Sequence, residues 1–299
     1  MIFFKELDTI NFKPIEKADK PIFDKFFRIG YCESSKYTFT NIFMWRDLYD
    51  LRWAVEGDVL YIFAGDVAWQ PFGAAKKMPG AIEKVLELTC EFAFLEKSFV
   101  AELEKYPAAQ FEISADKSKS DYVYSAQDLI NLSGRKFHGK KNHLNQFYKD
   151  YPAAEYAAIT AEIIPHCLER LDAWYEMQVA NFPALRENLS HERHGISEVF
   201  EDFEFFGLKG GAILLGGKVA AFTFGEMLNS NTAVIHVEKA DAEIRGAYTA
   251  INQQFLAHEW ASVEFVNREE DLGIEGLRRA KESYRPIKMV DKFSAKVIA

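Results

Sequence analysis

The chain has 299 residues, of which 48% are hydrophobic and 15% aromatic, and its formal net charge at pH 7 is -9. This composition supplies ample core material for about two domains and argues against disorder, and the acidic balance argues against a general nucleic-acid coat. No stretch approaches the roughly 20 apolar residues that span a bilayer, and the opening MIFFKELD is too soon charged for a signal peptide, so we expect a cytoplasmic protein.

The first half of the sequence predicts helices mixed with short strands. Apolar positions at helical spacing follow Pro21, and Gly30 is a plausible end of that helix. From Thr38 the sequence turns aromatic and β-rich, and Glu56-Gly57-Asp58 lies between LRWAV and VLYIFA as the turn of a hairpin. Two helices and a strand are then expected over residues 81–94, 98–106 and 110–114.

A polar, turn-prone stretch, ADKSKSD at residues 115–121, interrupts this pattern. After it, Ser125-Ala126-Gln127-Asp128 has the form of a capping box and begins a short helix that stops at Gly134. We therefore expect a first domain over residues 1–120, basic connecting helices over 121–150, and a second domain over 151–299.

The segment RKFHGKKNHLNQFYK, residues 135–149, contains five Lys and Arg residues and no acid. On a helical wheel, apolar residues such as Phe137 and Leu144 fall opposite a polar side that includes Arg135 and Lys149. Two interpretations stay open: an amphipathic connecting helix with a solvated basic face, or a docking face for phosphates or a nucleic-acid backbone.

The second half predicts helices followed by alternating strands and helices. A long helix runs through IPHCLERLDAWYEMQ, residues 181–190 are irregular, and another helix covers 195–206. Gly216-Gly217 is a two-residue hairpin signal between strands at 210–215 and 218–228. The remaining expected elements are strands at 232–237, 262–266 and 287–296 and helices at 247–257 and 275–284. This order describes a mixed α/β fold with antiparallel and parallel pairs.

The turn Arg245-Gly246-Ala247, between a strand and a helix, is a candidate anion-binding loop. The first N–H groups of a helix are unsatisfied, and its dipole favours negative charge there. Gly246 lets the backbone approach a ligand closely, and Arg245 adds a forked donor set that suits phosphate. We expect these residues and Tyr248 to bind the phosphates of a donor; the alternative is a plain tight turn.

Glu238 and His236, on the strand before that turn, are candidate bases. Because alternate residues of a strand project to one face, we expect the two side chains on a common face. Either group would deprotonate an acceptor amine. The alternative for Glu238 is an ion pair with a neighbouring Lys or Arg.

Residues 267–271 follow the end of an expected strand, where pockets of α/β sheets usually open. We therefore include Asn267 and Arg268 in the donor site. Three acidic residues beside Arg268 also suit magnesium, but a solvated loop capped by Asn267 explains them more simply. No metal site is expected, and the three cysteines lie far apart without a second ligand at metal spacing.

Four strings between residues 121 and 296 resemble a known family: YSAQDLINLSGRKFHGKKNHLNQF, GGKVAAFTFGE, VIHVEKADAEIRGAYTAINQQF and NREEDLGIEGLRRAKESYRP. They look like the C-terminal domain of bacterial phosphatidylglycerol lysyltransferases and its free-standing relatives, a tandem of two GNAT-like acyltransferase domains. The resemblance implies that the Arg-Gly-Ala loop grips the donor and that the first half, which matches only in outline, is a degenerate copy of the second. It also implies that Tyr284 protonates the leaving group, with Lys281 on the same helix face binding the donor; the alternative for Tyr284 is a core phenol.

The activity that the resemblance implies is transfer of an aminoacyl group from a charged tRNA to an amine or hydroxyl acceptor, a small molecule or a lipid headgroup, without a tightly bound cofactor. Two alternatives stay open: an N-acetyltransferase that uses acyl-CoA, and a non-catalytic binding protein that keeps the fold. With tRNA as the donor, contacts are expected from the basic segment, at Arg135, Lys136, His138, Lys140, Lys141, Asn142 and Lys149.

Overall fold

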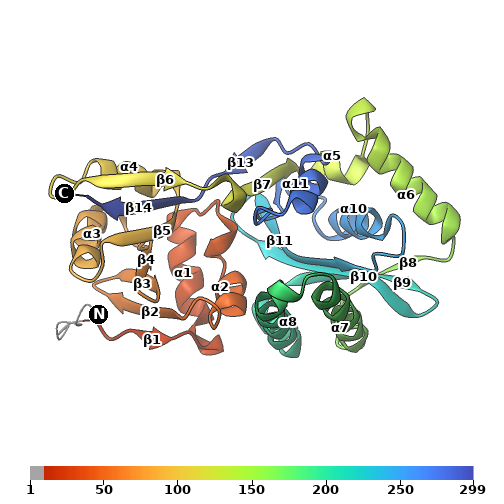
Figure 1. Ribbon diagram of the computed structural model, residues 1–299, viewed down its shortest axis with the longest axis horizontal. Helices are drawn as coiled ribbons and strands as arrows, with labels where there is room; N and C mark the ends of the chain where they lie inside the picture. Colours follow the sequence, from red (N-terminus) through yellow and green to blue (C-terminus); the bar gives the residue numbers. More distant parts are fainter. Residues whose placement is uncertain (1–9, 299) are drawn as a thin grey trace. The chain divides into compact units, whose positions relative to one another are not determined.

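The structure, a computed structural model, describes residues 10–298 (Figure 1). The chain forms two compact units: unit 1 comprises residues up to Lys117 and those from Asp291 onward, and unit 2 comprises Ser118–Val290. The first boundary lies in the polar stretch where the sequence predicted one. Residues 121–150, however, belong to unit 2, and the end of the chain belongs to unit 1, so the expected connecting segment and second domain differ from the observed division.

The sheet of unit 1 has the strand order β1-β2-β3-β4-β5-β14-β6. Neighbouring strands are antiparallel except β4 and β5, which are parallel. The expected hairpin is confirmed, because β2 and β3 pair across Gly57 and Asp58, both with positive φ. The strands are β1 (Lys13–Pro14), β2 (Leu51–Glu56), β3 (Val59–Ala64), β4 (Val67–Trp69), β5 (Glu91–Leu95), β6 (Phe111–Ala115) and β14 (Phe293–Val297).

The sheet of unit 2 has the order β13-β7-β12-β11-β10-β9-β8, again with one parallel pair, β11 and β12. The hairpin expected at Gly216-Gly217 is confirmed by the pairing of β9 with β10. The strands are β7 (Asp121–Ser125), β8 (Glu155–Ala158), β9 (Lys209–Leu215), β10 (Lys218–Met227), β11 (Thr232–Ala240), β12 (Phe265–Asn267) and β13 (Lys288–Val290).

The two sheets have the same pattern of pairing. Each runs through four antiparallel strands to a parallel neighbour and then to two further antiparallel strands. In unit 1 the strand between β5 and β6 is β14, from the end of the chain, and Figure 1 shows it in blue beside β6. In unit 2 the corresponding strand between β12 and β13 is β7, which follows β6 directly in the sequence. The described part of the chain can be divided into two repeats of seven strands each, β1–β7 and β8–β14, and each repeat contributes its last strand to the sheet built by the other.

Unit 1 is packed with aromatic rings. Tyr37, 1% exposed, lies edge-on to Phe72 and Trp69, with ring centroids 4.7 and 6.1 Å away. A second cluster around Phe92 and Leu95 fills the space between the sheet and its later helices. The helices of unit 1 are α1 (Lys20–Gly30), α2 (Phe39–Trp45), α3 (Met78–Leu86) and α4 (Lys97–Glu104).

In unit 2, helices cover both faces of the sheet. α7 and α8 lie on one side of β9 and β10, and α10 lies on the other (Figure 1). Phe200 of α8 contacts Phe222 and Phe224 of β10, whereas Ile251 of α10 belongs to a cluster with Ile213 of β9. No helix in the described range is long and apolar enough to cross a bilayer. The helices are α5 (Ala126–Asn131), α6 (His138–Asp150), α7 (Ile164–Asn181), α8 (Arg186–Glu201), α9 (Phe203–Phe206), α10 (Ala247–Glu259) and α11 (Glu275–Glu282).

Four expectations about these elements were wrong. The helix expected over 81–94 ends at Leu86, because EFAFL pairs with β4 and β14 as strand β5. The β-rich stretch after Thr38 begins with α2, whose N-cap is the Thr38 hydroxyl. Residues expected to be irregular begin α8 at Arg186. The last expected strand is two strands, β13 and β14, in different sheets.

Candidate active site in unit 2

An irregularity in β11 separates the environments of the two candidate bases. The pairing with β10 skips His236, whereas Ile235 and Val237 on either side of it are paired, so the strand carries a bulge. Ile235 lies in the apolar cluster with residues of α10, and Glu238, three residues later, also contacts α10. Side chains therefore do not alternate strictly between the two faces of β11, and the prediction that His236 and Glu238 share one face depended on that alternation.

Glu238 accepts a hydrogen bond on each of its carboxylate oxygens. Arg268 Nη2 donates to Oε1 at 2.9 Å, and Asn252 Nδ2 of α10 donates to Oε2 at 3.1 Å. The side chains of Glu238 and Arg268 are only 13% and 11% exposed. Next to this pair, Arg268 Nη1 and Asn252 Oδ1 are buried and have no hydrogen-bond partner among the described residues. A buried donor and a buried acceptor without partners are costly, which makes these two atoms candidates for contact with a ligand.

Two cations, Arg268 and Lys140, lie over the aromatic ring of Tyr284. The Arg268 guanidinium carbon lies 4.7 Å from the ring centroid, and Lys140 Nζ of α6 lies 3.9 Å from it. The Tyr284 hydroxyl lies 3.5 Å from Thr249 Oγ1. Burial raises the pKa of Tyr284, so the phenol keeps its proton near neutral pH. Burial, followed by the charge of Arg268, lowers the pKa of Lys140 to about 8. The cluster therefore combines a proton donor with an amine that is close to losing its proton.

The backbone that carries Arg268 is held by the residues around it. Asn267 is fully buried; its Nδ2 donates to Asp121 at 3.0 Å, and its Oδ1 accepts from the backbone N–H of Glu269 at 2.8 Å. Lys281 Nζ donates to the carbonyl oxygens of Arg268 and Glu269. Burial, followed by Arg268, lowers the pKa of Lys281 to about 8. Asn267 and Lys281, which the sequence placed in the donor site, thus hold the loop that presents Arg268.

His236 lies between two carboxylates. Its Nδ1 is 3.0 Å from Glu269 Oε1, its Nε2 is 3.0 Å from Glu226 Oε1 on β10, and its side chain is 1% exposed. Burial by itself lowers the pKa of His236, but the bonds and charges of the two carboxylates outweigh burial and raise the pKa to about 9. At neutral pH the ring is protonated, and in this state it cannot accept a proton as a base.

The candidate anion loop has the expected form. Gly246, with φ +90°, is the N-cap of α10. A Cβ on Gly246 would lie 2.7 Å from the backbone oxygen of His143 and 3.0 Å from Phe147 Cβ, so the glycine is required for the close packing of α6 against this loop. Arg245 and Tyr248 are exposed, whereas Ala247 is buried. The glycine thus has a packing role that is independent of any ligand.

The residues of the basic segment that were expected to contact tRNA divide into an exposed set and one inward residue. The exposed residues are Arg135, Lys136, His138, Lys141, Asn142 and Lys149. Lys136 forms an ion pair with Asp128 at 2.6 Å. Lys140 is half-buried over Tyr284, within the cluster around Arg268. The surface available to a nucleic-acid backbone therefore lies on η5 (Arg135–Phe137) and α6, and Lys140 is set apart from it.

A comparison with protein families identifies the chain. A family described as phosphatidylglycerol lysyltransferase, C-terminal, matches residues 30–296. The chain belongs to this family. The match extends through unit 1, beyond the strings of unit 2 that carried the resemblance in the sequence.

Solved structures similar to this lysyltransferase-family chain share its architecture. A conserved protein of unknown function from Bacteroides thetaiotaomicron is 35% identical, with a TM-score of 0.85, over 97% of this chain and 100% of its own. The C-terminal domain of a putative lysylphosphatidylglycerol synthetase from Agrobacterium fabrum is 14% identical, with a TM-score of 0.63, over 94% and 92% of the two chains. L-PGS from Bacillus licheniformis is 15% identical, with a TM-score of 0.57, over 83% and 84%. The fold is the expected tandem of GNAT-like α/β units.

Among curated proteins, an uncharacterized protein of Mycoplasmoides gallisepticum is 25% identical over 182 residues. The match covers 61% of this chain and 58% of that protein. The family to which the chain belongs is named for a lysyltransferase.

The fold brings to this lysyltransferase-family site some residues that the sequence did not predict for it. Asn252 and Thr249 lie on α10, after the predicted loop, and no pattern distinguished them from core positions. Lys140 was predicted as a nucleic-acid contact, but it lies over Tyr284; a signal for this was that it precedes Leu144 by four residues and so shares the apolar side of the helix. Glu226 became a partner of His236 only through the pairing of β10 with β11.

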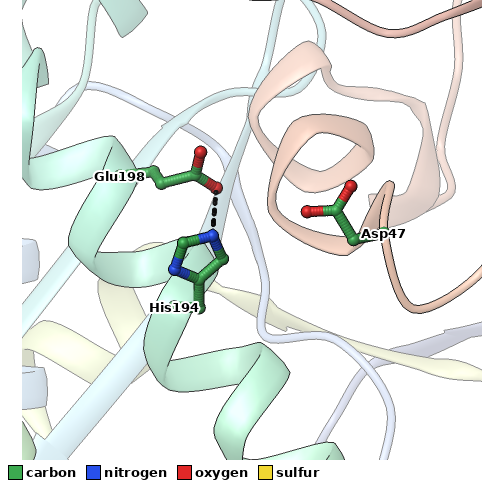
Figure 2. Close-up of side chains that lie close together, drawn as sticks. All are labelled: Asp47, His194 and Glu198. Atoms are coloured by element: carbon green, nitrogen blue, oxygen red, sulfur yellow. Dashed lines mark ion pairs between the residues drawn. The ribbon is translucent and has the colours of Figure 1, made fainter.

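Unit 2 also carries a histidine–carboxylate pair with an exposed histidine, which contrasts with buried His236. Figure 2 shows His194 and Glu198 on α8, with Nε2 and Oε2 3.5 Å apart. The His194 side chain is 63% exposed. Pairs of this kind, four residues apart on a helix, contribute a few tenths of a kcal/mol, about 0.3–0.5. We therefore assign this pair to the surface of the helix.

Proposed function

We propose that unit 2 transfers an aminoacyl group from a charged tRNA to an amine or hydroxyl acceptor, with the chemistry at the Glu238–Arg268–Tyr284 cluster. The observation that carries the proposal is the pair of unpartnered atoms beside Glu238, Arg268 Nη1 and Asn252 Oδ1. One donates and the other accepts, so together they fit a group that offers a carbonyl oxygen and an amine. An aminoacyl ester offers both, whereas an acetyl thioester has no amine.

Each residue of the cluster has a role in the proposed step. The acceptor attacks the acyl carbon, so that a new bond forms there while the ester bond to the carrier breaks. Glu238 takes the proton of the acceptor, Arg268 Nη1 stabilises the negative charge that develops on the carbonyl oxygen, and Tyr284 gives a proton to the leaving hydroxyl. Tyr284 carries its phenolic proton at the start of the reaction, as this role requires.

The exposed basic residues of η5 and α6 support tRNA as the carrier. They lie on the segment that also brings Lys140 to Tyr284, so one element links the basic surface with the cluster. Phosphate contacts from Lys and Arg make affinity for a nucleic acid fall steeply with salt. We expect the same of this protein and tRNA.

The test is a transfer assay with tRNA charged with a radiolabelled amino acid, amine and hydroxyl acceptors from cell metabolites, and mass spectrometry of the products. We expect a labelled adduct and its loss, by about 10²–10³-fold, in Arg268→Lys, because lysine keeps the charge but not the second nitrogen. The matched control is Arg279→Lys, in an exposed pair with Glu275 on the same unit, which should transfer at the wild-type rate.

Three results would overturn the proposal. Equal activity of Arg268→Lys and wild type removes the cluster from the chemistry. Transfer from acyl-CoA and not from charged tRNA identifies an N-acetyltransferase. Absence of transfer from either donor, by protein that binds tRNA, identifies a binding protein that keeps the fold.

A further inference from the structure

The loop that presents Arg268 is held in an unfavourable backbone conformation. Glu269 has φ +58°, a left-handed value that non-glycine residues seldom adopt and that costs of order 1 kcal/mol or more. Such a conformation persists only where surrounding contacts impose it. The backbone of Glu269 is bonded on both sides: its N–H donates to Asn267 Oδ1 at 2.8 Å, and its carbonyl oxygen accepts from Tyr122 N–H at 3.1 Å.

The side chain of Glu269 is held from β11 by His236. The 3.0 Å contact with Nδ1 places this carboxylate against a ring whose other nitrogen contacts Glu226. An imidazole can donate to two carboxylates at once only when both nitrogens carry protons. The imidazolium satisfies both contacts, whereas a neutral ring between two ionised carboxylates would turn one lone pair toward a carboxylate.

We propose that His236 is a positioning residue: as an imidazolium between Glu226 and Glu269, it fixes the loop that presents the Arg268 guanidinium to Glu238. The inference rests on the proposed function for the role of Arg268, but the mechanical link from His236 to Arg268 does not. His236 thereby takes a different role from the catalytic base that the sequence suggested.

The charged groups that face this contact come from four elements. Glu226 lies on β10 and Glu269 on the loop after β12, and both contact the ring. Lys239 on β11 and Lys281 on α11 act on Glu269 through their charges. Loss of the His236 proton leaves Glu226 and Glu269 without the cation between them, and their repulsion then favours release of Glu269. The Arg268 guanidinium should lose its fixed position at the same pH.

The experiment follows the Arg268 Nε–H signal of ¹⁵N-labelled full-length protein by NMR between pH 6 and 10, together with the His236 ring nitrogens. In wild type we expect the Arg268 signal to change with the His236 titration, with a midpoint at a pH of about 9. In His236→Gln, which is neutral at every pH, we expect solvent exchange of that proton at least about tenfold faster throughout, since tenfold corresponds to 1.4 kcal/mol of lost protection. Lys140 and Lys281 still titrate in this variant, and any change that they cause in the Arg268 signal has a midpoint separate from that of His236.

Two further variants keep the test decisive. Glu192→Gln removes the carboxylate of α8 that accepts from Lys239 Nζ at 2.7 Å, without touching Glu269, and it should behave as wild type. Glu226→Gln keeps the bond to Glu269 but removes one carboxylate, and it should lower the midpoint while leaving the Arg268 signal intact at pH 6; this variant serves if His236→Gln does not fold. An Arg268 signal that is unchanged in His236→Gln, or a midpoint that is unmoved in Glu226→Gln, would overturn the inference. Because the NMR signal does not depend on turnover, a failure of this inference can be distinguished from a failure of the transfer assay.

Discussion

Units 1 and 2 build the same sheet from different side chains. In both units the site of interest lies after the second strand of the parallel pair. In unit 1 that position is Glu96, 7% exposed, whose Oε1 accepts from the backbone N–H groups of Glu33 and Ser34 at 2.7 and 2.8 Å. In unit 2 it is Arg268, which reaches across to Glu238. The Glu96 carboxylate thus bonds backbone N–H groups of its own unit, whereas Arg268 forms an ion pair with a carboxylate on a neighbouring strand.

The neighbouring strands, β4 in unit 1 and β11 in unit 2, also carry different kinds of side chain at this edge. β4 ends at Trp69, 1% exposed, with its ring 4.9 Å from that of Phe94. β11 continues past a bulge to Glu238. Ligands of open α/β sheets gather at strand ends, but the chemistry depends on which side chains stand there. The two units therefore share a strand pattern, whereas the Glu238–Arg268 pair to which we assign the chemistry lies in unit 2.

The strongest test of the comparison replaces the two carboxylates. Glu238→Ala should lower transfer by about 10²–10⁴-fold while the protein still folds, because a proton acceptor is lost from the site. Glu96→Ala should leave transfer by the folded protein unchanged but lower the free energy of unfolding by about 1–3 kcal/mol for each backbone N–H left unpaired. Transfer rates at matched folded fraction, with urea unfolding followed by circular dichroism, measure both. A loss of turnover in folded Glu96→Ala would show that the chemistry is shared between the units.

The pH dependence of stability should distinguish unit 2 through His236. Its pKa is about 9 in the folded protein against 6.5 for an ordinary histidine. Because the pKa is higher in the folded protein, protonation of His236 stabilises the folded state. This stabilisation, about 3 kcal/mol, is complete below pH 6.5 and is lost as the pH rises through 9. Urea unfolding at pH 6 and pH 10 should show the loss in wild type and a smaller one in His236→Gln. Equal pH dependence of the two proteins would contradict this assignment.

Two glycines allow a matched comparison of backbone roles. Gly246→Ala in unit 2 should lower the free energy of unfolding by about 2–3 kcal/mol, because positive φ and the clash with His143 add. Gly57→Ala in the hairpin of unit 1 has positive φ but open space around it, so about 1 kcal/mol is expected. Thermal and urea unfolding of the two variants measure whether the packing of α6 on the loop adds to the free energy of unfolding. Equal losses would contradict it.

The smallest effect is expected at the surface. Lys141→Gln with Lys149→Gln should weaken tRNA binding a few-fold and reduce the slope of log affinity against log salt by about 2, because two phosphate contacts are lost. Lys76→Gln with Lys77→Gln, an exposed pair in unit 1, should change neither quantity. Titrations of labelled tRNA at several salt concentrations measure the difference. An equal effect of both pairs would mean that binding is not localised on η5 and α6.

Much of unit 2 could be predicted because its signals are local. Gly216-Gly217 and the Arg-Gly-Ala turn mark chain reversals by themselves, and the resemblance supplied the tandem fold. The site was predicted in part: Glu238, Arg268 and Tyr284 come together as candidates from three segments. The bulge at His236 could not be predicted, because it arises from the pairing of two strands and leaves the strand pattern of the sequence intact. The same holds for β5: its residues continued the helical pattern that begins at residue 81, but they pair with β14 as a strand.

The exchange of last strands has a consequence for how this protein is made. Sheet assembly in unit 1 needs residues Phe293–Val297, which leave the ribosome only after all of unit 2 through Val290. Until then β5 and β6 lack the partner that joins them, and their open edges are the feature that chaperones or premature strand pairing would meet in the nascent chain. A gene cut between the repeats would therefore encode two fragments, neither of which carries a complete sheet.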